Sequence, residues 1–300
     1  MKTRTLTRGA LSFTAHTWGF DANASGDIVL CLHGFPDNPH TFHKQAPALC
    51  AAGYRVIAPT MRGYEPSSQP PDGDYTLGAL ARDTIAWAKS LTDAPVHLLG
   101  HDWGAAVTYL AGALAPERFL SLATIAVPHV ARLPTAARKV PIQFLRSWYM
   151  TFFQLRGLAE WSLETGDWWL MRRLWRQWSP QYTPTTDEWA QRMATFSAPG
   201  VNRAMLSYYR QNASPRAMLG LSRTEASTLT TVPLSTLAIT GSDDRCIDTR
   251  LYEHLFHPHD FPAGFRIERI HGAGHFAHLE EPEAINTLLL SWFAQHTRRP

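Results

Sequence analysis

The segment Gly100-His101-Asp102-Trp103-Gly104 places one carboxylate between two glycines, after an apolar run and before a helix-like stretch. With this spacing, a tight turn raises the central side chain above the edge of a sheet, and the glycines leave room for the turn. A carboxylate that attacks a saturated carbon forms an ester, which water can hydrolyse, whereas a serine would form a stable ether. Asp102 is therefore predicted to be a nucleophile for epoxides or alkyl halides. The alternative is that Asp102 only caps the helix beginning at Trp103.

A histidine further along the chain could act as the base. His275 follows a glycine-rich turn after the last predicted strand, which is where a base that reaches Asp102 is expected. The chain order of nucleophile, acid and then histidine also agrees with this choice. His271 and His278 are nearby competitors, but His271 lies at the end of the strand. We predict His275 as the base.

The acid that orients this histidine is expected in the loop after the strand ending at Thr240. That loop contains Asp243 and Asp244, and Asp248 lies further on. We predict Asp244 as the acid, which would hold the histidine tautomer and stabilise its charged form. Asp243 is interpreted as a turn residue. The sequence leaves the choice between the two adjacent aspartates open.

The segment His33-Gly34-Phe35-Pro36 follows the first predicted buried strand. A loop at this place can supply one backbone N–H to an oxyanion hole, and the residue after the nucleophile supplies the other. The donors would be the N–H groups of Phe35 and Trp103, and both residues would also contact the substrate. By itself, a segment with Gly and Pro is equally compatible with an ordinary turn.

Apolar runs alternate with helix-like segments around these residues, as is typical of a parallel sheet covered by helices on both faces. The predicted strands are 28–32, 54–59, 96–100, 122–127, 233–240 and 265–270, and the predicted helices are 40–52, 77–91, 104–113 and 282–296. Residues 131–227 look helical and aromatic, with no convincing strand. We predict an α/β core of residues 1–130 and 232–300, interrupted by a helical cap of residues 131–231.

Composition argues against several other classes of protein. A net charge of +3, evenly spread over 300 residues, does not favour nucleic acid or an anionic membrane surface as a partner. No apolar run predicts a signal peptide or a membrane span, and the three unpaired cysteines indicate a cytoplasmic protein. The spacing of His254, His257 and His259 matches no standard metal motif, and no phosphate-binding or dinucleotide loop is present. We therefore expect no metal and no cofactor.

These motifs resemble those of the epoxide hydrolases of the α/β-hydrolase fold that use an Asp nucleophile. The resemblance is carried by the segments 33–37, 100–105 and 274–276, and it covers nearly the whole chain, more loosely in the predicted cap. It implies an α/β-hydrolase fold with a mostly parallel sheet, a monomer or homodimer, and a small hydrophobic epoxide as the substrate.

The family also carries two cap tyrosines that hydrogen-bond the epoxide oxygen. The resemblance implies Tyr149 and Tyr209 for these roles, and Tyr208 is the neighbour to exclude. Phenols suit the task because they are still protonated at neutral pH and can donate to an alkoxide. Either tyrosine could instead pack within the cap. The same segment holds seven of the eleven tryptophans, which either pack the cap or line an apolar cleft: Trp148, Trp161, Trp168, Trp169, Trp175, Trp178 and Trp189.

The resulting prediction is a hydrolase that opens epoxides to 1,2-diols through an alkyl ester of Asp102. The nearest alternative is a haloalkane dehalogenase, which uses the same triad. Such enzymes often have Asn where this chain has Phe35, and the two tyrosines favour an oxygen leaving group. A second alternative is a ligand-binding protein of the same fold without turnover, which a complete triad of Asp102, Asp244 and His275 disfavours.

Overall fold

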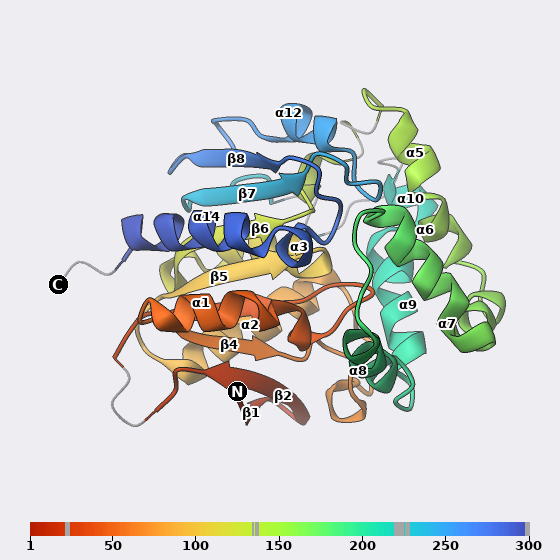
Figure 1. Cartoon of the computed structure of the whole chain (residues 1–300), viewed down its shortest axis with the longest axis horizontal. Helices are drawn as coiled ribbons and strands as arrows, with labels where there is room; N and C mark the ends of the chain where they lie inside the picture. The colour runs from red at the N-terminus through yellow and green to blue at the C-terminus, as the bar shows by residue number, and fades with distance from the viewer. Residues whose placement is uncertain (22–24, 134, 136–137, 219–224, 226–228, 298–300) are drawn as a thin grey trace.

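An eight-stranded sheet, in the order β1-β2-β4-β3-β5-β6-β7-β8, forms the centre of the described part of the protein (Figure 1). The computed structural model describes residues 1–21, 25–133, 135, 138–218, 225 and 229–297. The strands are β1 Lys2–Arg8, β2 Leu11–Trp18, β3 Ile28–Leu32, β4 Arg55–Pro59, β5 Val96–His101, β6 Phe119–Ile125, β7 Thr236–Gly241 and β8 Phe265–Ile270. The pairs β1–β2 and β2–β4 are antiparallel, and the others are parallel.

The central parallel strands are buried on both faces, which is why they appear as continuous apolar runs. Along β3, Val29 and Cys31 pack with helices α1 (Gln45–Ala51) and α14 (Pro282–Gln295). Leu30 and Leu32 point to the other face, where α2 (Leu77–Leu91) and α3 (Trp103–Leu114) lie. The predicted α/β architecture, with helices on both faces of a mostly parallel sheet, is confirmed.

The first two strands were not predicted. In β2, buried and less buried side chains alternate, with Leu11, Phe13 and Ala15 on the buried face. This alternation is the signal of an antiparallel strand that faces the core on one side only. A search for continuous apolar runs misses this pattern, and β1 is still harder to detect because Leu6 is its one buried residue.

The boundaries of two predicted strands differ from the structure by more than one residue. The strand expected over 122–127 begins at Phe119 and ends at Ile125, because Ala126 adopts a positive φ of 69° that an extended strand does not accommodate. The strand expected over 233–240 begins at Thr236. The helix expected over 40–52 is a short 3-10 helix, Pro39–His43, followed by α1.

A helical segment is inserted between β6 and β7. Its helices are α5 Ile142–Arg146, α6 Trp148–Phe152, α7 Leu158–Trp178, α8 Thr186–Phe196, α9 Val201–Asn212 and α10 Pro215–Met218. Figure 1 shows them together beyond the carboxyl ends of the parallel strands, which is the edge where sites form in this type of sheet. Among the described residues, no helix is both long and apolar enough to cross a membrane.

Candidate active site

Asp102 occupies the sharp turn between β5 and α3. Its backbone has φ 52° and ψ −118°, a conformation that costs a non-glycine residue energy and that is concentrated at functional sites. Gly104 is required here because a Cβ at that position would overlap the carbonyl oxygen of Leu32 in β3. The Asp102 side chain makes no capping hydrogen bond to α3. The carboxylate is therefore directed away from the helix that it precedes.

Two carboxylates flank the imidazole of His275. Its Nε2 atom lies 3.5 Å from Oδ2 of Asp102, and its Nδ1 atom lies 3.0 Å from Oδ2 of Asp244. The other oxygen of Asp244 accepts hydrogen bonds from the backbone N–H groups of Cys246 and Ile247, at 2.7 and 2.9 Å. Asp244 is thus held rigidly, and it orients the histidine ring between itself and Asp102.

The competing residues lie elsewhere. Asp243, the aspartate beside Asp244, is exposed, and its carboxylate accepts a hydrogen bond from Ser242. His271 is exposed at the end of β8. His278 is buried, but its Nε2 atom lies 2.6 Å from the hydroxyl of Thr41. Of these candidates, the structure brings Asp102, Asp244 and His275 together.

The charges around His275 determine its protonation. Burial of the ring lowers its pKa, whereas Cys246, Asp244 and Asp102 raise it, and the net result is a pKa well above the ordinary histidine value. The two carboxylates cause this shift, because burial raises the pKa of the Cys246 thiol and keeps it neutral. The raised pKa favours the charged form of the imidazole.

One of the two predicted oxyanion donors lies beside the Asp102 carboxylate. The backbone N–H of Phe35 donates to Oδ1 of Asp102 at 2.6 Å. The N–H of Trp103 is in the first turn of α3, where backbone N–H groups have no partner within the helix. The Phe35 loop approaches closely, since a Cβ at Gly34 would overlap the Asp102 side chain. One oxygen of Asp102 thus faces a backbone donor and the other faces His275.

Tyr149 and Tyr209 lie on the inserted helices next to these groups. Both are buried, and their rings are 5.6 Å apart. Burial is the main cause that raises the pKa of each phenol well above its ordinary value, and the charge of Asp102 adds to the shift in both. Both phenols are therefore protonated donors. Tyr208, by contrast, donates its hydroxyl to the backbone carbonyl of Arg62 at 2.6 Å.

Sequence reasoning assigned no role at this site to Phe153 or Cys246, and it left open whether Trp178 packs the cap or lines an apolar cleft. The ring of Phe153 lies 5.0 Å from that of Tyr209, and the indole of Trp178 lies 5.1 Å from the ring of His275. The Sγ atom of Cys246 lies 3.3 Å from the hydroxyl of Tyr149. Of Phe153 and Cys246, Phe153 could have been inferred, because it follows Tyr149 by four residues and so shares its helix face.

The seven tryptophans of the inserted segment fall into different environments. Trp178 packs against the ring of Tyr149 at 5.0 Å, and Trp175 stacks on Phe276, the residue after His275, at 3.4 Å. Trp168 and Trp189 are buried, and Trp148 is partly buried. Trp161 and Trp169 are exposed. Of the seven, Trp178 contacts the ring of His275 directly.

Within the described ranges, no group of three or more His, Cys, Asp or Glu side chains is arranged to hold a metal ion. His257 and His259 stack on each other, with ring centroids 5.5 Å apart, and His259 lies 3.2 Å from Asp260. The three cysteines are unpaired thiols.

Known proteins share this architecture. A sequence profile described as alpha/beta hydrolase fold matches residues 27–282. AB hydrolase superfamily protein YfhM of Bacillus subtilis is 31% identical over 268 residues, which cover 89% of this chain and 90% of that protein. Bifunctional epoxide hydrolase 2 of Sus scrofa is 25% identical over 92% of this chain, but the match spans only 53% of the length of that protein.

A solved structure agrees with these sequence matches. Epoxide hydrolase VrEH1 from Vigna radiata superposes with a TM-score of 0.80 at 25% identity, covering 98% of both chains. The sheet order, the turn at Asp102 and the profile match lead to the same conclusion. The chain belongs to the α/β-hydrolase fold family.

Proposed function

We propose that this protein is an epoxide hydrolase that converts small apolar epoxides to 1,2-diols through an alkyl ester of Asp102. The observation that carries the proposal is a carboxylate at the nucleophile turn with a backbone N–H on one oxygen, His275 on the other, and two protonated phenols nearby. The names of the pig and Vigna radiata relatives support the same substrate class.

In the first step, one oxygen of Asp102 attacks a ring carbon, a C–O bond forms, and the epoxide C–O bond breaks. Tyr149 and Tyr209 donate hydrogen bonds to the leaving oxygen, and one of them transfers a proton to it. A carboxylate can act as the nucleophile at a saturated carbon because the ester that forms can be hydrolysed in a second step. The product of this step is a hydroxyalkyl ester on Asp102.

In the second step, a water molecule attacks the ester carbonyl of Asp102 while His275 takes a proton from it. The N–H groups of Phe35 and Trp103 stabilise the oxyanion that forms. Collapse of this intermediate breaks the acyl C–O bond, releases the diol and restores the carboxylate. The proton that His275 takes from the water restores its charged form, so that one epoxide and one water give one diol.

Ester formation prepares His275 for its role as a base. In the free enzyme, two carboxylates stabilise the charged imidazole. Alkylation removes the negative charge of Asp102, so the pKa of His275 falls and the ring can pass its proton to the tyrosine that lost one in the first step. The base thus becomes available when the ester exists.

Residues 131–231 would act as a cap over the carboxyl ends of the strands. The rings of Phe35, Tyr149, Phe153, Trp178 and Tyr209 form a connected aromatic group, with centroid separations of 5.0 to 6.3 Å. Such a lining favours an apolar substrate, which the few polar groups orient.

The test is a single turnover of styrene oxide in water labelled with ¹⁸O, with enzyme in excess. The ester route places the label first in Asp102 and not in the diol, because the diol oxygen comes from the carboxylate. Direct entry of solvent oxygen into the diol would contradict the ester route. Halide release from 1-bromobutane without diol formation from any epoxide would instead support a haloalkane dehalogenase.

A further inference from the structure

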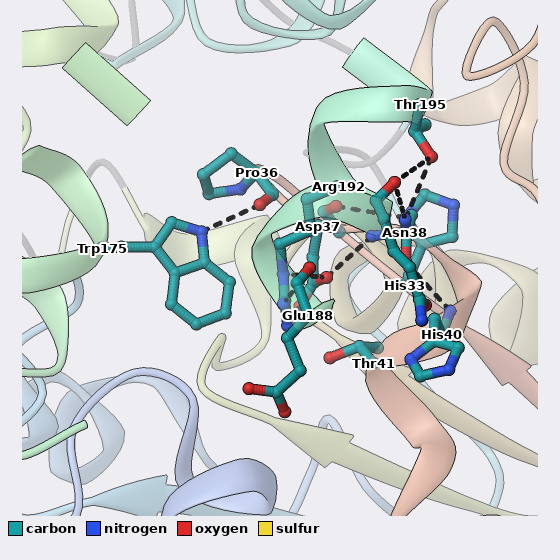
Figure 2. Close-up of polar contacts among 12 residues, drawn as sticks. His33, Pro36, Asp37, Asn38, His40, Thr41, Trp175, Glu188, Arg192 and Thr195 are labelled. Carbon is teal, nitrogen blue, oxygen red and sulfur yellow. Dashed lines mark hydrogen bonds and ion pairs between the residues drawn. The ribbon is translucent and has the colours of Figure 1, made fainter. Parts of the chain in front are cut away.

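Three consecutive residues after Phe35 make hydrogen bonds or an ion pair with the inserted helices (Figure 2). The indole N–H of Trp175, on α7, donates to the carbonyl oxygen of Pro36 at 2.9 Å. Nε of Arg192, on α8, lies 2.9 Å from Oδ1 of Asp37. The amide of Asn38 donates to the carbonyl of Gln191 and to the hydroxyl of Thr195, at 3.2 and 3.0 Å.

The ion pair at the centre of this cluster is buried. The side chains of Arg192 and Asp37 are 4% and 0% exposed, and the guanidinium lies 4.4 Å from the ring centroid of Trp175. Arg192 also donates to the carbonyl of Glu188 in its own helix. A buried pair of this kind adds little net stability, but removing one partner is costly, so its main contribution is to specify one geometry.

We propose that Arg192 and Trp175 are positioning residues for the N–H of Phe35. The position of this oxyanion donor then depends on the inserted helices and not on the core alone. The inference rests on the proposed function. The first of these contacts is made by Pro36, the residue after Phe35. The N–H of Phe35 donates to Asp102 from the same loop. A shift of α7 or α8 away from the core would carry the donor with it.

The two chemical steps depend on this donor to different extents. During ester formation, the Asp102 carboxylate loses negative charge, so an N–H beside it gains nothing in the transition state. During ester hydrolysis, negative charge develops on the carbonyl oxygen. Removing a hydrogen-bond donor to such an oxygen lowers the rate by about 10²–10³-fold. Removing the contacts of Trp175 and Arg192 with this loop should therefore slow hydrolysis of the ester and leave the rate of its formation unchanged.

This difference gives a kinetic signature. When only hydrolysis slows, kcat and KM fall together and kcat/KM is unchanged, because kcat/KM reports the steps up to ester formation. We expect Arg192→Met and Trp175→Phe to lower kcat and KM for styrene oxide by about ten-fold each, since the donor is displaced and not deleted. Arg192→Lys, which retains the charge, should restore part of kcat.

Arg132→Met is the matched control. Arg132 also lies in the inserted segment and pairs with a buried core carboxylate, that of Asp260, at 2.6 Å, but it does not touch residues 33–38. Its kcat and KM should stay at the wild-type values. Trp175→Phe deletes the N–H donor and keeps an aromatic ring, so it carries the test if Arg192→Met does not fold.

A fall in kcat at constant KM would overturn the inference, because loss of folded enzyme produces that result. Unchanged kcat in Trp175→Phe and Arg192→Met would also overturn it. A wild-type protein that forms no diol would contradict the proposed function itself, which separates the two failures.

Discussion

The hydroxyl of Tyr149 lies 3.3 Å from the Sγ atom of Cys246, which is two residues after Asp244. The loop that supplies the acid for His275 therefore also contacts one of the two buried phenols. Within the described part of the chain, the hydroxyl of Tyr209 has at most a weak contact with the indole N–H of Trp103, which lowers its pKa, and no other hydrogen-bond partner. A thiol is a weak hydrogen-bonding group. Both hydroxyls are thus available to an oxygen atom of a substrate.

The first prediction concerns these two phenols. Tyr149→Phe and Tyr209→Phe should each slow ester formation by about 100-fold, because each removes a donor to the leaving oxygen. Rapid-quench measurement of the ester on Asp102 gives this rate. Cys246→Ala should change it by less than about three-fold, in line with the modest value of one weak hydrogen bond.

Tyr208→Phe is the control for Tyr209→Phe. It removes the hydrogen bond to the carbonyl of Arg62, so it should lower the free energy of unfolding by about 1 kcal/mol. The rate of ester formation should be unaffected. Equal losses of rate in the Tyr208 and Tyr209 variants would show that these phenols act through packing alone.

The second prediction is that His275→Gln traps the ester. The imidazole is required to activate water in the second step, whereas the first step needs only Asp102 and the phenols. Mass spectrometry of this variant after incubation with styrene oxide should show one substrate mass added to the peptide containing Asp102. Recovery of unmodified protein, or an adduct on another peptide, would refute the ester mechanism.

The third prediction concerns the pKa of His275, which lies well above the usual histidine value in the free enzyme. Asp102→Asn replaces one flanking carboxylate by a neutral group, as alkylation does, so the charged imidazole loses a stabilising partner and its pKa should fall. Titration of the ring by NMR measures the change. Asp243→Asn, at an exposed neighbour of Asp244, should leave this pKa unchanged.

The raised pKa of His275 also affects the rate of ester hydrolysis. A charged imidazole cannot accept a proton, so ester hydrolysis should slow as the pH falls through the pKa of His275 in the ester form. That value should lie below the pKa measured by NMR in the free wild-type enzyme. An equal or higher value would exclude the loss of the Asp102 charge as the event that frees the base.

The fourth prediction concerns the close approach of the Phe35 loop to the nucleophile. A methyl group in Gly34→Ala would overlap the Asp102 side chain and the carbonyl of His101, so diol formation should fall by at least about 100-fold, the usual cost of a displacement of about 1 Å. Gly112→Ala, in α3, meets only the movable side-chain ends of Leu122 and Leu234 and should keep its activity. Equal activity of the two variants would contradict the close approach.

Much of the site could be predicted because its signals are local. The turn at Asp102 is encoded by adjacent glycines between a strand and a helix, and a carboxylate there restricts the chemistry to saturated carbon. Five of the eight strands were predicted because buried parallel strands are continuous apolar runs, and β8 was predicted although its apolar and charged residues alternate. β1 and β2 were missed because a strand with one buried face alternates instead.

The contacts that complete the site join residues far apart in the chain, so no local pattern encodes them. Asp243 and Asp244 are equivalent in sequence, and only the folded loop turns Asp244 toward His275 and leaves Asp243 exposed. Two further contacts depend on how the inserted helices pack on the core. They are the contact between Tyr149 and Cys246 and the ion pair between Arg192 and Asp37. The sequence by itself determined the turn and the carboxylate on it, because adjacent residues specify both. The tertiary structure decided which side chains surround that carboxylate, because packing alone brings distant segments into contact.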